Sequence, residues 1–156
     1  MIRKASLNDY NQISKLVSEV HQLHVLNRPD VYLDLKQPFS YDSFLQLLEE
    51  PTSNLFVIEN SNQNLIGYGI INLLKTRSLT IMKPSTIAYI DDFCISFSYQ
   101  HQGYGAQLFD YLKEYAKEQG ATSLQLTVWE FNEPAIAFYE KMGMSTRNRR
   151  LELPLK

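Results

Sequence analysis

The sequence predicts a mixed α/β sandwich whose first half is mostly antiparallel. For the first half, this prediction depends on two observations: a pair of apolar runs and the polar turn between them. Strand-like apolar runs at 55–58 and 65–74 lie on either side of a polar turn at 60–64. A pair of such runs separated by a short polar turn is typical of a β-hairpin. These strands are therefore expected to be antiparallel neighbours.

A third observation concerns the second half. A helical pattern over 105–119 lies between strand-like runs at about 86–95 and 124–128. A strand that follows its predecessor through one helix usually lies parallel to it in the same sheet. The 156 residues contain no repeat, low-complexity tract or linker, so we expect a single domain, 1–156.

The elements before the hairpin are predicted from the spacing of apolar residues and from capping residues. A short strand is expected to begin at Ile2, and Ser6 and Asp9 have capping-box spacing. An amphipathic helix is predicted from about 8 to 26, and a second one at 41–50. The apolar positions that define the first helix are Ile13, Leu16, Val17, Val20 and Leu23.

The elements after the crossover are shorter. The helix over 105–119 is expected to stop at Gly120. A further helix is predicted over 135–142, ended by Gly143, and a last strand over 151–153.

Composition excludes several classes of protein. Apolar residues make up 44% and charged residues 21%, which is typical of a globular protein. The net charge of −2 argues against nucleic acid as the main partner. No apolar run approaches the roughly 20 residues that span a bilayer, and no secretory signal is present. Cys94 is the only cysteine and fits a reducing compartment, so we expect a cytoplasmic protein.

The segment 95–106 has the clearest chemical pattern. A strand ends there, a short loop follows, and Gly103 and Gly105 open a helix. Free N–H groups at a helix N-terminus form an anion site, and glycine lets a phosphate approach the backbone. The spacing is too short for GxGxxG, and GxxxxGK[ST] is absent. Taken alone, the two glycines can equally serve a tight turn.

Two motifs together resemble the GNAT superfamily of N-acetyltransferases. Gln100-x-x-Gly103-x-Gly105 is similar to its (Arg/Gln)-x-x-Gly-x-(Gly/Ala) signature, and residues 132–143 are similar to its Asn-x-x-Ala-x-x-(Phe/Leu)-Tyr-x-x-x-Gly segment. The resemblance implies a sheet with an antiparallel N-terminal half, a parallel pair splayed at the centre, and helices on both faces. It also implies acetyl-CoA as the donor and a primary amine as the acceptor.

The resemblance places the donor's pyrophosphate on the backbone of the glycine turn. The family often has Arg at the position of Gln100 and basic residues near the first glycine, so binding here is expected to depend on backbone amides. The pantetheine arm is expected to meet backbone groups of Phe93 and Ile95 and the side chain of Asn132. The binding residues of the turn are then Gln100, His101, Gln102, Gly103, Tyr104, Gly105 and Ala106.

Acetyl transfer to an amine requires loss of an amine proton, stabilisation of an oxyanion and a proton donor for the leaving thiolate. The sequence places no Cys/His or Ser/His pair together, which favours direct attack in a ternary complex over an acyl-enzyme. By resemblance, Tyr139 lies beside the CoA sulfur and donates to the thiolate. Its alternative role is that of an aromatic residue packed on the sheet.

The base is predicted from strand alternation. With unbroken alternation Tyr89, Asp91, Phe93 and Ile95 share one face of their strand. The resemblance implies that this strand lines the cleft and that a carboxylate or histidine on this face takes the amine proton through water. We therefore choose Asp91 as that group, with Asp92 in reserve because a β-bulge exchanges the faces. In the alternative interpretation one of the two acids has a structural role.

Other residues are interpreted more simply. Cys94 is expected in the core. His21 and His24 lie three apart on a helix without an evident third ligand, so no metal is predicted. The basic residues near the C-terminus (Arg147, Arg149 and Arg150) are expected on a solvated edge. Four aromatic residues can line an acceptor pocket or, as ranked first, fill the core: Tyr32, Phe39, Tyr41 and Phe44.

Two other functions remain open at this stage. One is a non-catalytic acyl-CoA-binding sensor or partner protein, and the other is a nucleotide-binding protein that uses the same glycine turn. The acceptor of an enzyme can be a small amine or a protein amine. The resemblance also allows a homodimer, which the sequence does not itself indicate.

Overall fold

The computed structural model describes residues 1–76 and 81–156. Its five-stranded sheet has the order β1-β2-β3-β4-β5, in which the first four strands are antiparallel neighbours and β5 is parallel to β4. The predicted mixed fold with a parallel crossover is therefore confirmed. The strands are β1 Ile2–Lys4, β2 Ser53–Glu59, β3 Leu65–Lys75, β4 Thr86–Ile95 and β5 Ser123–Leu126.

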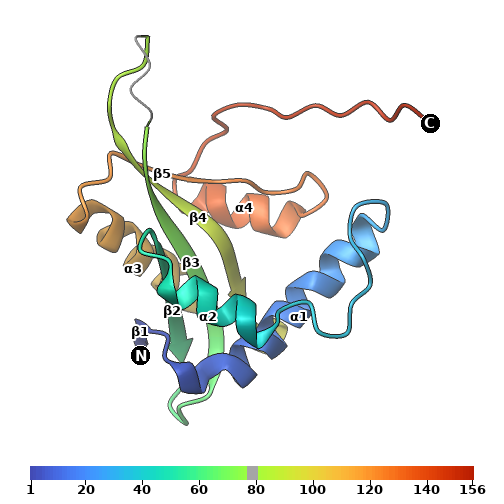
Figure 1. Cartoon of the computed structure of the whole chain (residues 1–156), viewed down its shortest axis with the longest axis vertical. Helices are drawn as coiled ribbons and strands as arrows, with labels where there is room; N and C mark the ends of the chain where they lie inside the picture. The colour runs from blue at the N-terminus through green and yellow to red at the C-terminus, as the bar shows by residue number, and fades with distance from the viewer. Residues whose placement is uncertain (77–80) are drawn as a thin grey trace.

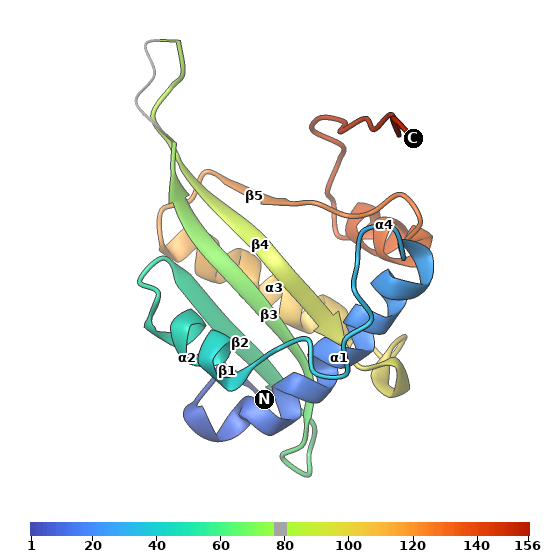
Figure 2. The same cartoon turned by 45° about the vertical axis from the view of Figure 1, so that its right-hand side comes forward.

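Helices cover both faces of this sheet (Figure 1; Figure 2). One cluster of buried residues lies under α1 and α2, and a second cluster lies under α3 and against α4. Leu108, Phe109 and Leu112 of α3 face the sheet, as their spacing predicts. The helices are α1 Tyr10–Asn27, α2 Tyr41–Glu49, α3 Tyr104–Glu118 and α4 Glu133–Lys141, with 3₁₀ turns at Leu7–Asp9 and Phe97–Tyr99.

The parallel pair is splayed. β4 pairs with β5 only through residues 87–90, opposite 123–126. Beyond Ile90, β4 continues to Ile95 paired with β3 alone. In Figure 2 the chain after β5 diverges from β4. One edge of β4 is therefore open in the described structure, and it leads directly to the glycine turn.

A bulge in β4 corrects the prediction of unbroken alternation. Ile70 of β3 pairs with Asp92 and Ile71 pairs with Ile90, so Asp91 is the extra residue. Before the bulge Ile90 packs on the α3 side of the sheet, and after it Phe93 packs there. Tyr89 and Phe93 therefore do not share a face, and Asp91 does not follow the alternation that was used to choose it.

The predicted strand at 151–153 is wrong. Residues 145–156 form no helix or strand, and the segment reaches away from the body of the molecule (Figure 1). Its alternating leucines are exposed, because no neighbouring strand lies beside them in the described structure. A strand pattern in the sequence requires a partner edge before it becomes a strand.

The aromatic residues near α2 are mostly core, as ranked first. Phe44 is fully buried and Phe39 packs against it, whereas Tyr41 is 45% exposed and contacts Tyr10 from outside the core. Tyr32 is also outside the core, because it lies in a pocket described below. Cys94 is buried beneath α1, as predicted. Within the described parts of the chain, no helix combines the length and the apolar character required to cross a membrane.

An ion-pair network anchors the N-terminal strand. The guanidinium of Arg3 donates to both carboxylate oxygens of Asp9, at 2.8 and 2.9 Å, and to Glu59 at 2.7 Å. The same Asp9 carboxylate accepts from the backbone N–H of Ser6 at 2.6 Å. These hydrogen bonds, that of Arg3 above all, lower the pKa of Asp9 from 3.8 to about 2. The charged form of Asp9 therefore stabilises the fold.

Asp9→Asn should lower the free energy of unfolding at neutral pH by roughly 1–2 kcal/mol, because the variant loses the ionic part of this interaction. A lowered pKa stabilises the fold above 3.8, and this contribution disappears as the pH falls toward about 2. The difference between variant and wild type should shrink over that interval in urea unfolding experiments. Asp30→Asn, which removes an exposed partner of Arg28, is the control and should have a smaller effect. A difference that does not change with pH would contradict the assignment.

Candidate active site

The glycine turn leaves a row of backbone donors free. Gly103 has φ +87° and precedes the first residue of α3, and His101 has φ +60°. Among the described residues, no backbone N–H from 100 to 106 donates to a protein acceptor. N–H groups of this kind at a helix N-terminus, together with the helix dipole, favour an anion. The geometry suits a diphosphate.

Two glutamine side chains hold the shape of the turn, which contains no lysine or arginine. The amide of Gln100 donates to the carbonyl oxygen of Ile95 at 3.0 Å, and that of Gln102 donates to Ser98 at 3.2 Å. Gly105 also has a packing role, because a Cβ there would lie 3.3 Å from the ring of Phe138. Tyr104 and Ala106 are partly buried at the start of the helix, and His101 is exposed.

The open edge of β4 presents backbone groups next to this turn. The N–H of Ser96 donates to Ile66 of β3. Since successive residues of a strand direct their backbone groups to opposite sides, those of Phe93 and Ile95 face the open side. Two are already engaged: the N–H of Phe93 donates to the Asp92 carboxylate at 2.9 Å, and the carbonyl of Ile95 accepts from Gln100. The others can meet an extended chain.

Tyr139 lies on α4, next to the aromatic residues of the α3 face. Its ring centroid is 6.2 Å from that of Phe93 and 6.2 Å from that of Phe109. The hydroxyl makes no hydrogen bond with the described residues, where every buried side-chain oxygen has a partner, so it reaches solvent-accessible space. Burial, and then the charges of Asp92 and Cys94, raise the pKa of Tyr139. The phenol is protonated at neutral pH.

Asn132 caps the helix that carries Tyr139. Its side-chain oxygen accepts from the N–H of Ala135 at 3.3 Å, and Pro134 lies in the first turn. Asn132 therefore has a structural role as the N-cap of α4. Its side-chain NH₂ is left to donate to a ligand.

A cavity of about 230 Å³ lies on the other face of the sheet, and we call it the α1–β4 pocket. Asp92 is its carboxylate, and two histidines and a tyrosine supply its remaining polar atoms. The pocket contains no lysine or arginine. Its lining residues are Val17, Val20, His21, His24, Tyr32, Pro38 and Asp92.

Asp92 is held rigidly in this pocket. One carboxylate oxygen accepts from the hydroxyl of Tyr68 at 2.6 Å, and the other accepts from the N–H of Phe93. Burial raises the pKa of Asp92, against the opposing effect of these two hydrogen bonds. A carboxylate in such surroundings attracts a cation and binds a proton more readily than one in water. Asp91, by contrast, is exposed at the bulge.

His24 is a site residue that the sequence did not assign to this chemistry. Its Nδ1 lies 2.8 Å from the carbonyl oxygen of Val20, which can only accept. The neutral ring therefore carries its proton on Nδ1, and Nε2 is an acceptor. The helical spacing of His21 and His24 indicated one face, but only the fold brings that face to Asp92. The described residues contain no cluster of three metal-ligating side chains.

The segment after β5 contacts two residues that line the pocket, Tyr32 and His24. The indole N–H of Trp129 donates to the hydroxyl of Tyr32 at 2.9 Å, and the ring of Phe131 packs against His24. The guanidinium of Arg28 lies 4.7 Å from the Trp129 ring centroid. These contacts join α1 to the strand-to-helix connection that leads to α4.

The burial of Cys94 excludes one catalytic route. Burial raises the pKa of this thiol far above its usual value, so it is not the thiolate that an acyl-enzyme requires. The two faces of β4 therefore present a turn of free backbone N–H groups with a phenol on one side and a carboxylate pocket on the other. A donor and an acceptor can meet at the splay between β4 and β5.

Comparison with known proteins agrees with this geometry. Residues 17–144 match the sequence model described as the Acetyltransferase (GNAT) family. The chain is 25% identical over 153 residues to a protein named thialysine N-epsilon-acetyltransferase from Bos taurus, a match covering 92% of this chain and 82% of that protein. It is 44% identical over 48 residues to an uncharacterized N-acetyltransferase from Lactobacillus delbrueckii subsp. lactis. That shorter match covers 31% of this chain and 28% of the relative.

Solved structures extend the likeness to the whole fold. The tetramutant of the BH1408 protein from Bacillus halodurans superposes with a TM-score of 0.96 at 28% identity, covering 99% of both chains. Glucosamine-6-phosphate N-acetyltransferase from Arabidopsis thaliana superposes with a TM-score of 0.72 at 16% identity, covering 100% of this chain and 98% of that one. The second likeness is one of fold alone.

Proposed function

Because this chain belongs to the acetyltransferase (GNAT) family and is an N-acetyltransferase, we propose that acetyl-CoA is its donor and a primary amine its acceptor. The observation that carries the donor is the row of unpaired backbone N–H groups from 100 to 106 at the start of α3. The buried free thiol of Cys94 is compatible with the reducing cytoplasm, which we propose as the compartment.

The residues present fit the donor at both ends of the site. Free N–H groups suit its diphosphate, and the open backbone edge at Phe93 and Ile95 suits a chain that carries amide groups. When bound, acetyl-CoA supplies a thioester carbonyl for attack and a thiolate as leaving group. Tyr139 would donate a hydrogen bond to that thiolate, and Asn132 would donate one to the chain leading to it.

The α1–β4 pocket supports an ammonium-bearing acceptor. Its one carboxylate attracts the cation, its aromatic rings are compatible with one, and no lysine or arginine in its lining repels one. The bovine relative's name gives the N-epsilon position of thialysine as the place of acetylation. We propose that the acceptor is the amino group at the end of an aliphatic chain, on a small molecule or on a protein.

The amine must lose a proton before it attacks. Asp91 is the base predicted from the sequence, and it lies at the bulge where it can pass a proton to solvent. Asp92 lines the pocket itself, so we propose that it orients the ammonium and takes the proton first. The Nε2 of His24 provides a second acceptor that aligns the nitrogen.

The test is release of free thiol from acetyl-CoA in the presence of a panel of aliphatic primary amines. Amine-dependent turnover is the expected result. CoA-dependent thermal stabilisation without turnover would replace the proposal with a non-catalytic acyl-CoA-binding protein. Stabilisation by ATP or NAD but not by CoA would overturn the donor assignment.

Gly103→Ala should weaken CoA binding by about ten-fold, because alanine resists the left-handed conformation and disturbs the N–H groups on both sides. No atom lies within 4 Å of the position that its Cβ would occupy, so the effect comes from the backbone. Isothermal titration with CoA measures it.

Gly120→Ala provides the matched control for this prediction. Gly120 also has positive φ, at +78°, with nothing within 4 Å of its added Cβ, and it lies at the opposite end of α3. It should have a similar backbone cost and unchanged CoA affinity. Equal affinities in both variants and the wild type would remove the turn from the donor site.

A further inference from the structure

A carboxylate of α1 holds the chain that leads from β4 to the glycine turn. One oxygen of Glu19 accepts from the hydroxyl of Ser96 at 3.0 Å, and the other accepts from the backbone N–H of Phe97 at 3.1 Å. Ser96 directly follows β4, and Phe97 begins the 3₁₀ turn before the glycines. Figure 2 shows the segment 96–103 beside α1. Both oxygens of Glu19 are therefore used to attach this segment to the helix.

Few other hydrogen bonds attach this segment to the rest of the fold. The side chain of Asn60 donates to the hydroxyl of Tyr99 at 3.2 Å, and the N–H of Ser96 donates to β3. The two glutamine side chains of the turn bond only to nearby carbonyl oxygens of the same stretch of chain. Within residues 1–76 and 81–156, Glu19 is the only charged side chain that hydrogen-bonds to 96–103. The glycine turn therefore depends on Glu19 for its position relative to α1.

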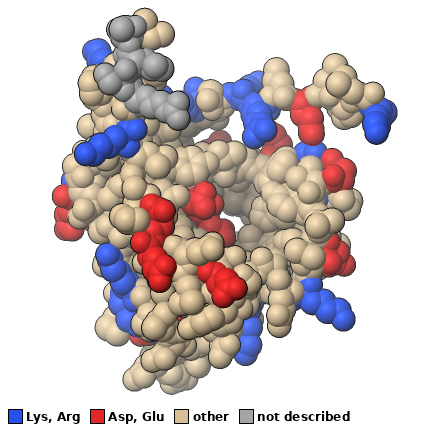
Figure 3. All heavy atoms as spheres, viewed as in Figure 1, with Lys and Arg blue, Asp and Glu red and all other residues tan. Residues whose placement is uncertain are grey.

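The same helix forms one wall of the α1–β4 pocket. Its residues Val17, Val20, His21 and His24 line that pocket, and Glu19 lies between them in sequence. In Figure 3 a hollow opens between β4 and the C-terminal half of α1, with acidic side chains at its edge. One helix therefore contacts the proposed acceptor pocket directly and the glycine turn through Glu19.

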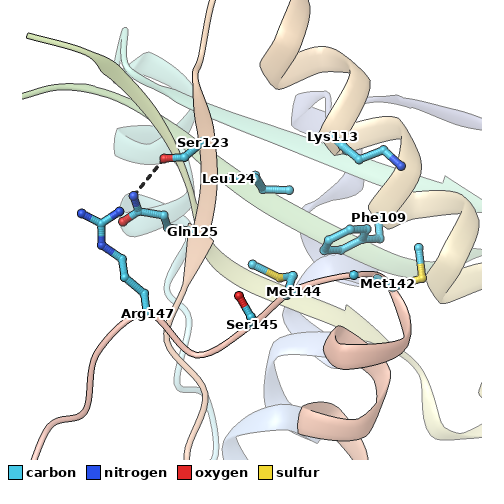
Figure 4. A pocket seen from close by; sticks show the side chains of 10 residues that line it. Phe109, Lys113, Ser123, Leu124, Gln125, Met142, Met144, Ser145 and Arg147 are labelled. Carbon is cyan, nitrogen blue, oxygen red and sulfur yellow. Dashed lines mark hydrogen bonds between the residues drawn. The ribbon is translucent and has the colours of Figure 1, made fainter.

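The charge of Glu19 has the wrong sign to attract a diphosphate, because like charges repel. None of the ion pairs in the described parts of the chain includes Glu19. Lys113 of α3 pairs with Asp110 at 2.6 Å, and with Arg147 it lines a groove of about 460 Å³ between α3 and β5 (Figure 4). These basic side chains serve other places in the fold. Glu19 therefore acts on the turn through its hydrogen bonds and not through its charge.

We propose that Glu19 is a positioning residue, which holds the glycine turn against α1 in the shape that the diphosphate of the donor requires. Its carboxylate acts through Ser96 and Phe97 and does not itself touch the donor. A turn that is already ordered loses less conformational entropy on binding, so the donor binds more tightly. This role rests on the proposed donor, since it concerns the N–H groups from 100 to 106. The chemical step should not depend on it, because Tyr139 lies on α4.

Two substitutions of Glu19 separate geometry from charge. Glu19→Ala removes both hydrogen bonds, and we expect it to weaken CoA binding by roughly ten-fold in isothermal titration. The KM for acetyl-CoA should rise by a similar factor, whereas kcat and the KM for the amine should change by less than about two-fold. Glu19→Gln keeps an oxygen for the N–H of Phe97 and gains an NH₂ that donates to the hydroxyl of Ser96. It should retain CoA affinity to within about two-fold of the wild type.

Two further variants supply a second test and a control. Ser96→Ala removes only one of the two hydrogen bonds and changes no charge, so it should weaken CoA binding by roughly three-fold. It tests the role of Glu19 independently of any effect of the alanine substitution on folding. Ser18→Ala alters the neighbouring position of α1, where the hydroxyl donates only to the carbonyl oxygen of Ser14 in the same helix, at 2.9 Å. Its CoA affinity should equal that of the wild type.

The outcomes distinguish this role from the proposed donor. A wild type that does not bind CoA would overturn the donor and the role of Glu19 together. If the wild type binds CoA and both Glu19→Ala and Ser96→Ala bind it equally well, the donor stands and the role of Glu19 is wrong. It is also wrong if the two Glu19 variants change CoA affinity equally, because charge is then the cause. A fall in kcat and melting temperature of Glu19→Ala without a change in CoA affinity would likewise contradict it.

Discussion

Tyr139→Phe should lower kcat by about 100-fold and leave CoA affinity nearly unchanged. The ring of Tyr139 packs against Phe93, Phe109 and Phe138, and phenylalanine retains these contacts. Only the hydroxyl is lost, and it has no partner among the described residues. The variant therefore removes an interaction with the leaving group and little else.

The direction of the pKa shift limits the role of this hydroxyl. Burial raises the pKa of Tyr139 above its ordinary value of 10.0. A thiol ionises near pH 8.5, so complete proton transfer from Tyr139 to the thiolate is uphill. Its contribution is then a hydrogen bond that strengthens as negative charge develops on sulfur, and solvent can complete the protonation. The expected loss of about 100-fold is therefore at the lower end of the range for acid catalysis.

Steady-state kinetics with saturating acetyl-CoA, together with titration of CoA, measure the two parts of this prediction. Tyr115→Phe is the matched control, because Tyr115 packs on the same core cluster and burial likewise raises its pKa. It lies near the end of α3, far along the helix from the glycine turn. Unchanged turnover in the Tyr139 variant, or equal losses in both variants, would remove the phenol from the mechanism.

The fold could be predicted from the sequence where a pattern has a local cause. The hairpin at 60–64, the crossover through α3 and the glycine stops at Gly120 and Gly143 each follow from short-range backbone preferences. The turn that opens α3 was predicted in the same way, because a backbone position with positive φ favours glycine, which can be recognised in the sequence. The position of this turn could therefore be predicted from the sequence, whereas the roles of its residues stay a prediction.

Other features depend on contacts that no local pattern encodes. The bulge at Asp91 arises from the register with β3, and it changes which side chains share a face with Phe93. The strand pattern at 151–153 requires a neighbouring strand, and in the described structure this segment lies beside none. The α1–β4 pocket joins a helix and a strand about seventy residues apart in sequence, so the helical spacing of its histidines alone did not reveal it.

Asp92→Asn should lower kcat/KM by 100-fold or more without destabilising the protein at neutral pH. Asparagine has nearly the same shape, and its amide can still bond Tyr68 and the N–H of Phe93. The raised pKa of Asp92 means that its ionisation opposes folding. A stabilising contribution from the protonated form is complete below 3.8 and is lost as the pH rises through the pKa of the folded state.

A structural role and a catalytic role of Asp92 therefore predict opposite results for the Asp92→Asn variant. If Asp92 only supports the fold, its replacement lowers the melting temperature and the activity together. If it orients the ammonium and takes its proton, the melting temperature at neutral pH is unchanged or higher, activity falls, and the acidic limb of kcat/KM against pH disappears. Asp91→Asn is the control at the exposed neighbouring position. Loss of activity in the Asp91 variant alone would move the base from the α1–β4 pocket to the bulge, because the two carboxylates differ chiefly in what surrounds them.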